Sequence, residues 1–215
     1  MTILDDLAAM GRALAGAGLV VGAGGNLSAR DGPRMIIKPS GYDMDKVRPD
    51  EWAVLDIASG RQTAGPRAAS EWELHLRTLR ARPEANFVCH AHPPVAVGLI
   101  SGGQDLVAFT PDFIAFVDRV EHVPFIMPAG PELAKAVEAA FRTGAPAVAL
   151  RNHGFVTIGR TMREALVRML SIEDGAKTQM AALVAGKPRP LTPQEQDAIR
   201  GMGVEAYRRQ VLGGG

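Results

Sequence analysis

Two histidines separated by one residue, His90 and His92, stand out as groups that could bind a metal. The segment that contains them reads FVCHAH over 87–92 and is typical of a short strand. Side chains alternate between the two faces of a strand, so both imidazoles point the same way and can hold one cation. A third imidazole, His153, occurs in the sequence RNHG. Three neutral imidazoles with an open fourth position are the ligands of a catalytic zinc ion, although a pair of half-buried polar residues is the simpler alternative.

The composition indicates a globular domain of ordinary character. The chain has 215 residues, of which 47% are hydrophobic and 22% charged, and its formal net charge is +1. One domain over 1–215 is therefore expected. The charge gives no reason to expect nucleic acid or an acidic membrane as a partner. No apolar run approaches the roughly 18 residues of a membrane span, and the first residues lack the pattern of a signal peptide, so we expect a cytoplasmic protein.

The single cysteine, Cys89, excludes an intrachain disulfide, which fits a reducing compartment. Strand alternation places it on the face away from His90 and His92. We therefore expect a small buried side chain rather than a nucleophile or a metal ligand.

Hydrophobic spacing and turn residues predict a mixture of helices and strands. The predicted helices cover about 3–18, 70–80, 94–101, 131–142, 161–184 and 192–212, and the predicted strands cover 35–37, 52–57, 87–92, 147–150 and 155–158. A Pro-rich connector at about 186–193 precedes the last helix. The order of elements favours an α/β fold with a largely antiparallel sheet flanked by helices.

Three pairs fit the capping box, in which a Ser or Thr and a Glu three residues later satisfy the first turn of a helix: Ser70 with Glu73, Thr161 with Glu164, and Thr192 with Glu195. Glu73 would thus be occupied, which leaves Glu71 as the freer acid and the candidate general base or metal neighbour. A glutamate on a helix surface without any role is the alternative. His75, four residues after Glu71, is a weaker candidate ligand, and His122 is expected at the surface or in packing.

Several segments could accommodate an anion. They are the glycine-rich loop over 22–28, Lys38, the pair Ser40-Gly41, and the helix start at Ser70. Glycines allow backbone N–H groups to approach an anion, and a helix start favours phosphate. The loop has neither a Walker ending nor a dinucleotide-binding spacing. Each segment alone could be a plain turn or a solvated lysine, but together they could form one phosphate site.

Taken in order, five motifs resemble the class II aldolase/adducin family, and most of all its fuculose-1-phosphate aldolase branch. They are GNLS at 25–28, IKPSG at 37–41, ASEWELH at 69–75, HAH at 90–92 and NHG at 152–154. The resemblance implies a three-layer α/β/α sandwich around a mainly antiparallel sheet. It also implies a C4 homotetramer with active sites between neighbouring subunits, and a zinc cofactor with Mn²⁺ or Co²⁺ as alternatives.

The resemblance assigns roles to particular residues. Those that fall on the zinc ligands are His90, His92 and His153; those that fall on phosphate-binding positions are Asn26, Ser40, Gly41 and Ser70, with Gly25 beside them. Glu71 falls on the catalytic acid/base, whose pKa we expect to be raised. Tyr207 matches a C-terminal tyrosine of the aldolases. Asp112 lies near the position where the related epimerases place an acid donated across the subunit interface. Ala69 replaces a second serine of the family.

The implied activity is cleavage of a ketose 1-phosphate to dihydroxyacetone phosphate and an aldehyde. Candidate substrates are fuculose-1-phosphate, a rhamnulose-1-phosphate-like sugar, 5-deoxyribulose-1-phosphate and methylthioribulose-1-phosphate. A sugar-phosphate 4-epimerase, a dehydratase and a decarboxylase on the same scaffold stay open as alternatives. A non-catalytic adducin-like scaffold protein is a further alternative, against which the three histidines argue.

Overall fold

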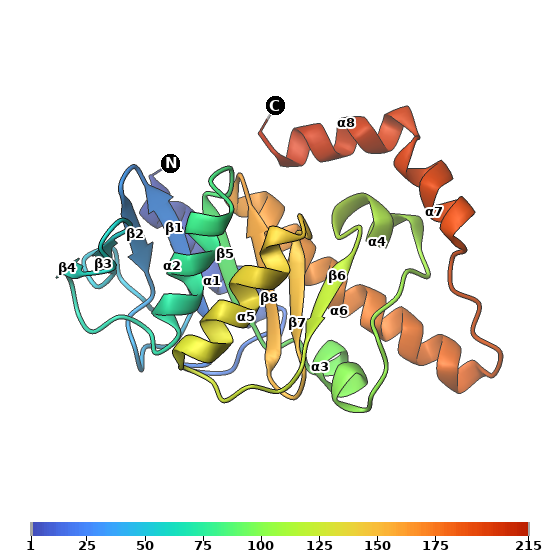
Figure 1. Ribbon diagram of the computed structural model, residues 1–215, viewed down its shortest axis with the longest axis horizontal. Coiled ribbons are helices and arrows are strands. Elements are labelled where there is room, and N and C mark those ends of the chain that lie inside the picture. Colours follow the sequence, from blue (N-terminus) through green and yellow to red (C-terminus); the bar gives the residue numbers. More distant parts are fainter. Residues whose placement is uncertain (1, 215) are drawn as a thin grey trace.

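A computed structural model describes residues 2–214, and within this range the chain forms one eight-stranded sheet with helices on both sides (Figure 1). The spatial order of the strands is β4-β3-β2-β1-β5-β8-β7-β6. Their bounds are β1 (Asn26–Asp31), β2 (Arg34–Ile37), β3 (Ala53–Asp56), β4 (Gln62–Ala64), β5 (Phe87–Ala91), β6 (Val120–Val123), β7 (Ala147–Leu150) and β8 (Gly154–Gly159). Only the β6–β7 pair is parallel within the described range. The predicted mainly antiparallel sheet is confirmed.

Helices cover both faces of the sheet. Their bounds are α1 (Ile3–Gly16), α2 (Trp72–Ala81), α3 (Pro94–Ser101), α4 (Pro111–Phe116), α5 (Pro131–Arg142), α6 (Met162–Ala185), α7 (Pro193–Arg200) and α8 (Gly203–Leu212). One hydrophobic cluster joins α2 and α5 to the sheet, and the other joins α1, α3, α4 and α6 to its opposite face. The expected α/β/α sandwich is therefore present.

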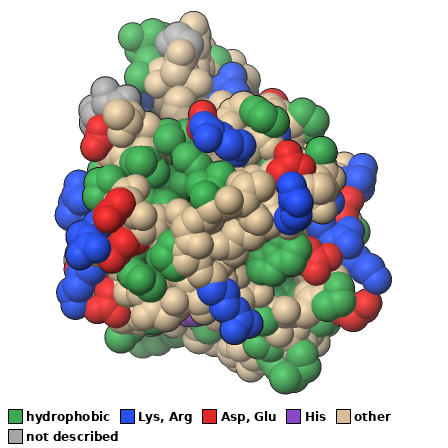
Figure 2. Space-filling model, turned by 90° about the vertical axis from the view of Figure 1, so that its left-hand side faces the viewer, with side chains coloured by type: hydrophobic (Ala, Val, Ile, Leu, Met, Phe, Trp, Pro, Cys, Tyr) green, Lys and Arg blue, Asp and Glu red, His purple; other side chains and the backbone are tan. Residues whose placement is uncertain are grey.

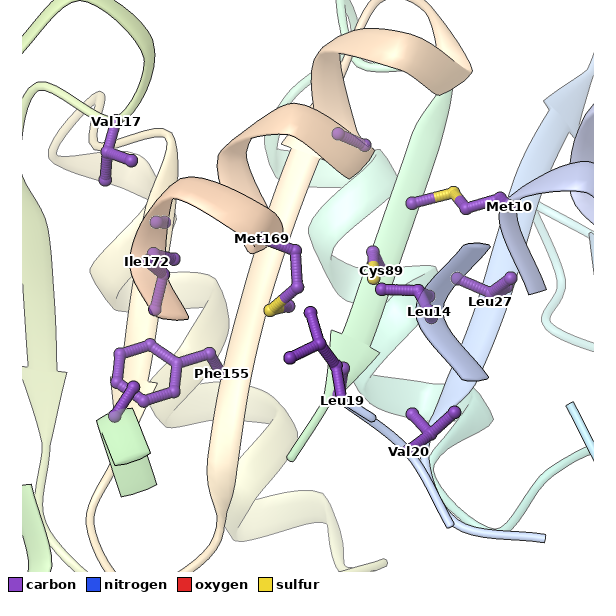
Figure 3. Packing of buried hydrophobic residues seen from close by; sticks show 14 of the residues in the cluster. Met10, Leu14, Leu19, Val20, Leu27, Cys89, Val117, Phe155, Met169 and Ile172 are labelled. Carbon is purple, nitrogen blue, oxygen red and sulfur yellow. The ribbon is translucent and has the colours of Figure 1, made fainter. Parts of the chain in front are cut away.

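Alternation along β5 divides its side chains between these two clusters. Cys89 and Ala91 pack with α1 and α6, where Met10, Leu14 and Met169 surround the thiol (Figure 3). Val88 packs with α2 and α5 on the other face. Cys89 is fully buried, and burial raises the pKa of its thiol. The thiol is thus protonated and inert, as expected for a packing residue.

One of the three predicted capping boxes is complete, that of Thr192 and Glu195. At Thr161 only half of the box forms: its hydroxyl accepts from the Glu164 backbone N–H, while the Glu164 carboxylate accepts from the backbone N–H of Arg160 instead. The box at Ser70 is wrong. Helix α2 starts two residues later, at Trp72, its cap position is Glu71, and no side chain caps it. Glu73 instead pairs with Arg77 at 2.8 Å, one turn along the helix.

Several elements were not expected from the sequence. Strand β1 begins inside the predicted glycine-rich loop, and α4, β4 and β6 were missed. The predicted C-terminal helix is broken at Gly201, because Met202 adopts an extended conformation between α7 and α8. Across residues 2–214, none of the helices combines the length and the apolar character that a membrane span requires. Charged side chains of both signs are interspersed on the face shown in Figure 2.

Candidate metal centre and active site

The three candidate metal ligands meet at one end of the sheet. His90 is the fourth residue of β5, His92 follows that strand, and His153 lies in the turn between β7 and β8. Nε2 of His90 and Nε2 of His92 are 3.1 Å apart, and one ring nitrogen from each histidine lies within 4.8 Å of the others. The structure thus brings together residues that are 63 positions apart in the chain, counted from His90 to His153.

Backbone geometry allows this close approach. Asn152 has a φ of 57°, in the left-handed region, and so turns the chain sharply before His153. A Cβ at Gly154 would lie 2.6 Å from the carbonyl oxygen of Ala91 and 2.7 Å from Cδ2 of His92. Only glycine therefore lets β8 pass beside the end of β5, and this contact sets the separation of the histidines.

Hydrogen bonding fixes the ring of His90 in the form that binds metals. Its Nδ1 lies 3.0 Å from the carbonyl oxygen of Phe155, and a carbonyl can only accept, so Nδ1 carries the proton. Nε2 therefore presents a lone pair to Nε2 of His92 and to Oε2 of Glu71, which is 3.0 Å away. Tetrahedral zinc with Zn–N distances of about 2.0–2.1 Å would separate two nitrogens by roughly 3.3 Å, close to the observed spacing.

Two buried atoms beside the cluster have no hydrogen-bond partner among residues 2–214: Nδ1 of His153 and Oε1 of Glu71. Buried polar atoms are normally satisfied, so the unpartnered Oε1 of Glu71 beside the converging ring nitrogens fits a site for a cation. The donor set of three imidazoles and a neighbouring carboxylate fits a divalent metal ion.

The pKa shifts agree with this interpretation. Burial lowers the pKa of His92 to about 4 and also lowers the pKa of His153, and protonation of the neighbouring His90 would act in the same direction. Both rings are therefore neutral at pH 7, as metal binding requires. Burial opposes ionisation of Glu71, but His90 and His153 in their protonated forms favour the carboxylate more strongly, and together they hold the pKa of this carboxyl below its usual range. The expected raised pKa is wrong, because the groups around Glu71 favour its charged form.

A cavity of about 240 Å³ opens beside the histidines. All five residues predicted to bind phosphate line it: Gly25, Asn26, Ser40, Gly41 and Ser70. Glu71, His92 and His153 line the same cavity. Candidate metal ligands, candidate acid/base and candidate phosphate donors therefore share one space, although they come from five separate segments of the chain.

Lys38 was predicted as a possible part of the phosphate site, with a solvated surface lysine as the alternative, and the alternative is wrong. It lines the cavity, is 1% exposed, and its Nζ donates to the carbonyl oxygen of Ala23 at 3.0 Å. Burial lowers its pKa to about 8, against a smaller opposing effect of Asp43. The signal in the sequence was its position directly after the buried residues of β2, which carry the chain into the cavity.

His75 is not part of the metal cluster. It is fully buried on α2, where Nδ1 lies 2.8 Å from Oγ of Ser28 and Nε2 contacts Oδ1 of Asn26. Both ring nitrogens are therefore engaged away from the other histidines. His122 is mostly buried and lies 3.5 Å from Asp105, in agreement with the expected packing role.

Asp112 and Tyr207 do not line the cavity of their own chain. Asp112 on α4 pairs with Arg208 at 2.9 Å, and Tyr207 is 66% exposed on α8. In Figure 1, α8 lies at the end of the sheet opposite the β5–α3 and β7–β8 connections, which carry the histidines. A role for either residue at the metal would require a second subunit.

One further residue supports the site from a distance. The carboxylate of Glu173 on α6 accepts hydrogen bonds from the backbone N–H groups of Val95, at 3.2 Å, and Ala96, at 3.1 Å. These are the first free N–H groups of α3, so Glu173 caps the helix that begins two residues after His92. No local sequence pattern predicts this contact, because the partners are far apart in the chain.

Comparison with known proteins places this site in context. The family model described as class II aldolase and adducin N-terminal domain matches residues 5–180. A 5-methylthioribulose-1-phosphate/5-deoxyribulose-1-phosphate aldolase of Rhodospirillum rubrum is 29% identical over 195 residues, covering 85% of this chain and 82% of that protein. A 3-oxo-tetronate 4-phosphate decarboxylase of Haemophilus influenzae is 28% identical over 200 residues, covering 90% and 94%.

Solved structures agree with the sequence comparison. An L-fuculose 1-phosphate aldolase superposes with a TM-score of 0.86 at 28% identity, and the match covers 96% of each chain. The region matched by the family model contains every residue that lines the cavity.

Proposed function

The chain belongs to the class II aldolase and adducin family, and we propose that it is a metal-dependent aldolase that cleaves a ketose 1-phosphate to dihydroxyacetone phosphate and an aldehyde. The family and its aldolase relatives support a lyase, which agrees with the resemblance seen in the sequence. The observation that carries the proposal is the contact of Glu71 with His90, 3.0 Å apart, at the wall of a cavity lined by hydrogen-bond donors.

The metal would be held by His90, His92 and His153. A divalent cation at this position supplies Lewis-acid stabilisation of the negative charge that develops on the sugar oxygens as the carbon–carbon bond breaks. Zinc is the cation that three neutral imidazoles favour, with Mn²⁺ and Co²⁺ as alternatives. Nδ1 of His90 donates to Phe155, and this bond holds the ring with its lone pair towards the site.

Glu71 would transfer the proton. Its pKa is lowered, so the carboxylate is ionised at neutral pH, and Oε1 has no hydrogen-bond partner among the described residues. In the direction of synthesis, this oxygen would take a proton from a carbon of dihydroxyacetone phosphate. In the direction of cleavage, it would return that proton to the same carbon.

The phosphate would be bound by Asn26, Ser40, Gly41 and Ser70, with Gly25 beside them. Lys38 joins this group because its ammonium is buried at the cavity and is protonated below a pH of about 8. Fixing the phosphate orients the reacting carbons and so converts part of the binding energy into rate.

A neighbouring subunit would complete the site. We propose a C4 homotetramer in which Asp112 or Tyr207 of one chain approaches the metal of the next and protonates the aldehyde oxygen. Support comes from their position outside the cavity of their own chain and from the exposure of the Tyr207 side chain. A cytoplasmic location and a single domain over 1–215 stay predictions.

A decarboxylase is the second candidate. The relative from Haemophilus influenzae that is named a 3-oxo-tetronate 4-phosphate decarboxylase covers 90% of this chain. Its substrate also carries a phosphate and a ketone, so the same cavity could serve either reaction.

The test is an assay of purified protein after metal analysis. Each sugar of a panel of ketose 1-phosphates is supplied, and dihydroxyacetone phosphate is detected with NADH-dependent glycerol-3-phosphate dehydrogenase. Product should form with at least one sugar, disappear with a chelator and return with Zn²⁺. Release of CO₂ from 3-oxo-tetronate 4-phosphate without any dihydroxyacetone phosphate from the panel would favour the decarboxylase instead.

A further inference from the structure

A chain of hydrogen-bonded, buried side chains connects the buried face of α2 with the cavity. Ser28 Oγ lies 2.8 Å from Nδ1 of His75, and Nε2 of His75 contacts Oδ1 of Asn26. Nδ2 of Asn26 in turn lies 3.4 Å from Oε2 of Glu71. Ser28 and His75 are fully buried and Asn26 is 5% exposed, so water competes little for these contacts.

The direction of each hydrogen bond in this chain can be derived from its last member. Nδ2 of Asn26 donates to Oε2 of Glu71, so the amide presents its NH₂ group to this carboxyl group. The opposite orientation would place an amide oxygen against a carboxylate oxygen. With the NH₂ group facing Glu71, Oδ1 of Asn26 faces His75 and requires a donor there.

His75 supplies that donor in only one neutral form. Burial lowers the pKa of His75 to about 3, so the ring carries one proton at neutral pH. Because Oδ1 of Asn26 accepts, this proton must be on Nε2, and Nδ1 must accept from the hydroxyl of Ser28. The sequence of bonds is then consistent from the Ser28 hydroxyl through His75 and Asn26 to Glu71.

We propose that His75 is a positioning residue that locks the side-chain amide of Asn26 with its NH₂ group towards the cavity. The locked amide offers one N–H to Glu71 and the other to the anion in the cavity, while its oxygen is kept away from both. Without His75 the amide could rotate and turn its oxygen to the substrate phosphate, which would repel it. This inference rests on the proposed function, because it assumes that the anion is a sugar phosphate.

Two substitutions of similar size separate positioning from packing. The amide nitrogen of a glutamine can reach the place of Nε2, so His75→Gln keeps a donor for Asn26. The shorter His75→Asn reaches only the place of Nδ1, so it keeps a partner for Ser28 and leaves Asn26 unlocked. Thermal unfolding of both variants checks that each is folded at the assay temperature.

The readouts are affinity for inorganic phosphate by calorimetry, KM and kcat for the best ketose 1-phosphate, and bound zinc. His75→Asn should raise the phosphate Kd and the KM about tenfold or more, the scale of one hydrogen bond to a charged group, with kcat less affected and zinc unchanged. His75→Gln should restore both constants to within about threefold of the unmodified protein. Unchanged phosphate affinity and KM in a folded His75→Asn variant would overturn the proposal.

The hydrogen position can be measured directly, without reference to activity. Nitrogen-15 NMR of the histidine rings in the unmodified protein should show His75 protonated on Nε2 and bare on Nδ1. A proton on Nδ1 instead would overturn the proposal even if the protein is an aldolase. If the unmodified protein binds no phosphate, the proposed phosphate site is wrong. The NMR measurement of the His75 ring still tests the inferred orientation of the Asn26 amide in that case.

Discussion

Oε2 of Glu71 lies 3.0 Å from Nε2 of His90, and the two atoms approach from opposite elements, the start of α2 and the end of β5. Nδ1 of His90 already carries its proton for Phe155, so a carboxylate oxygen and a lone pair face each other. Such a pair is stable only around a shared proton or a cation. The proposed metal binding and the proposed proton transfer would therefore depend on the same few atoms, and substitutions can separate them.

Substituting a ligand should remove the metal. In His92→Ala, the chain loses one of three nitrogens, so bound zinc after dialysis and aldol cleavage should both be lost. Zinc is measured by mass spectrometry of the acid-digested protein. His122→Ala is the matched control, because His122 lies beside Asp105 and outside the cluster, and it should keep a full complement of zinc. Full occupancy in His92→Ala would rule out the site.

Glu71 and Glu73 should behave differently although only one residue separates them. Glu71→Gln keeps the shape of the side chain and removes the base, so kcat should fall by about 10²-fold or more while zinc stays bound. Glu73→Gln loses only a partly exposed pair with Arg77, so its free energy of unfolding should fall by no more than about 1 kcal/mol. The two variants are compared by steady-state kinetics and urea unfolding, and loss of activity in Glu73→Gln alone would reject the assignment.

Acid should destabilise the metal-free protein. Burial lowers the pKa of His75 to about 3 and of His92 to about 4, while an unfolded histidine titrates near 6.5. Between these values the unfolded state binds more protons, so stability is present above pH 6.5 and is lost as the pH falls. The slope is at most about 1.4 kcal/mol per pH unit for each histidine. Urea unfolding at pH 7, 6 and 5 measures it, and His75→Gln should show a shallower decline.

Binding of the substrate phosphate should depend on the charge of Lys38. A ketose without phosphate should be a very poor substrate. Lys38→Met should raise the KM of the phosphorylated sugar about tenfold or more, because one charged hydrogen bond is lost. Lys46→Met is the control, since Lys46 is exposed and pairs with Asp43. The pKa of Lys38 is lowered to about 8, so the ammonium is lost above that pH, and KM should rise there in the unmodified protein and not in Lys38→Met.

Mixing two inactive variants tests whether a second subunit completes the site. Asp112→Asn keeps the metal ligands and loses the candidate acid, while His92→Ala keeps the acid and loses the metal. Mixed tetramers would contain interfaces in which both halves are intact, so mixing should recover part of the activity. Subunit exchange is followed by native mass spectrometry. Exchange without recovery would leave Tyr207 as the candidate proton donor, and an active monomer would exclude both residues from the site.

The sequence was sufficient for features that depend on nearby residues. The alternation around Cys89 correctly separated a packing face from a histidine face, and Pro131 to Arg142 was predicted with its observed bounds. It was insufficient where distant contacts decide. In β1 only Leu27 and Ala29 alternate with polar residues, and the strand starts directly after glycines, so the signal is short. Strand β4 is an exposed edge strand of three residues and has no apolar alternation.

In the candidate site, too, the features set by nearby residues were predicted and those set by distant contacts were not. Its histidines and glycines follow from short motifs. The predicted cap at Ser70 is wrong because the turn before α2 places Glu71 at the cap position, with its carboxylate facing His90 and His153. The contacts of His75 and Lys38 depend on how α2 and β2 pack against distant parts of the chain, which a local sequence pattern cannot predict.

The cap of Glu173 on α3 has a consequence for the order in which the protein is made. Val95 and Glu173 are separated by 78 positions, so all three candidate metal ligands leave the ribosome before the residue that anchors the helix after His92. A nascent chain ending before α6 would hold the complete ligand set on an unanchored α3, and long-range contacts of this kind form late. We therefore expect the candidate metal site to be complete only when α6 has emerged and docked, late in the synthesis of the chain.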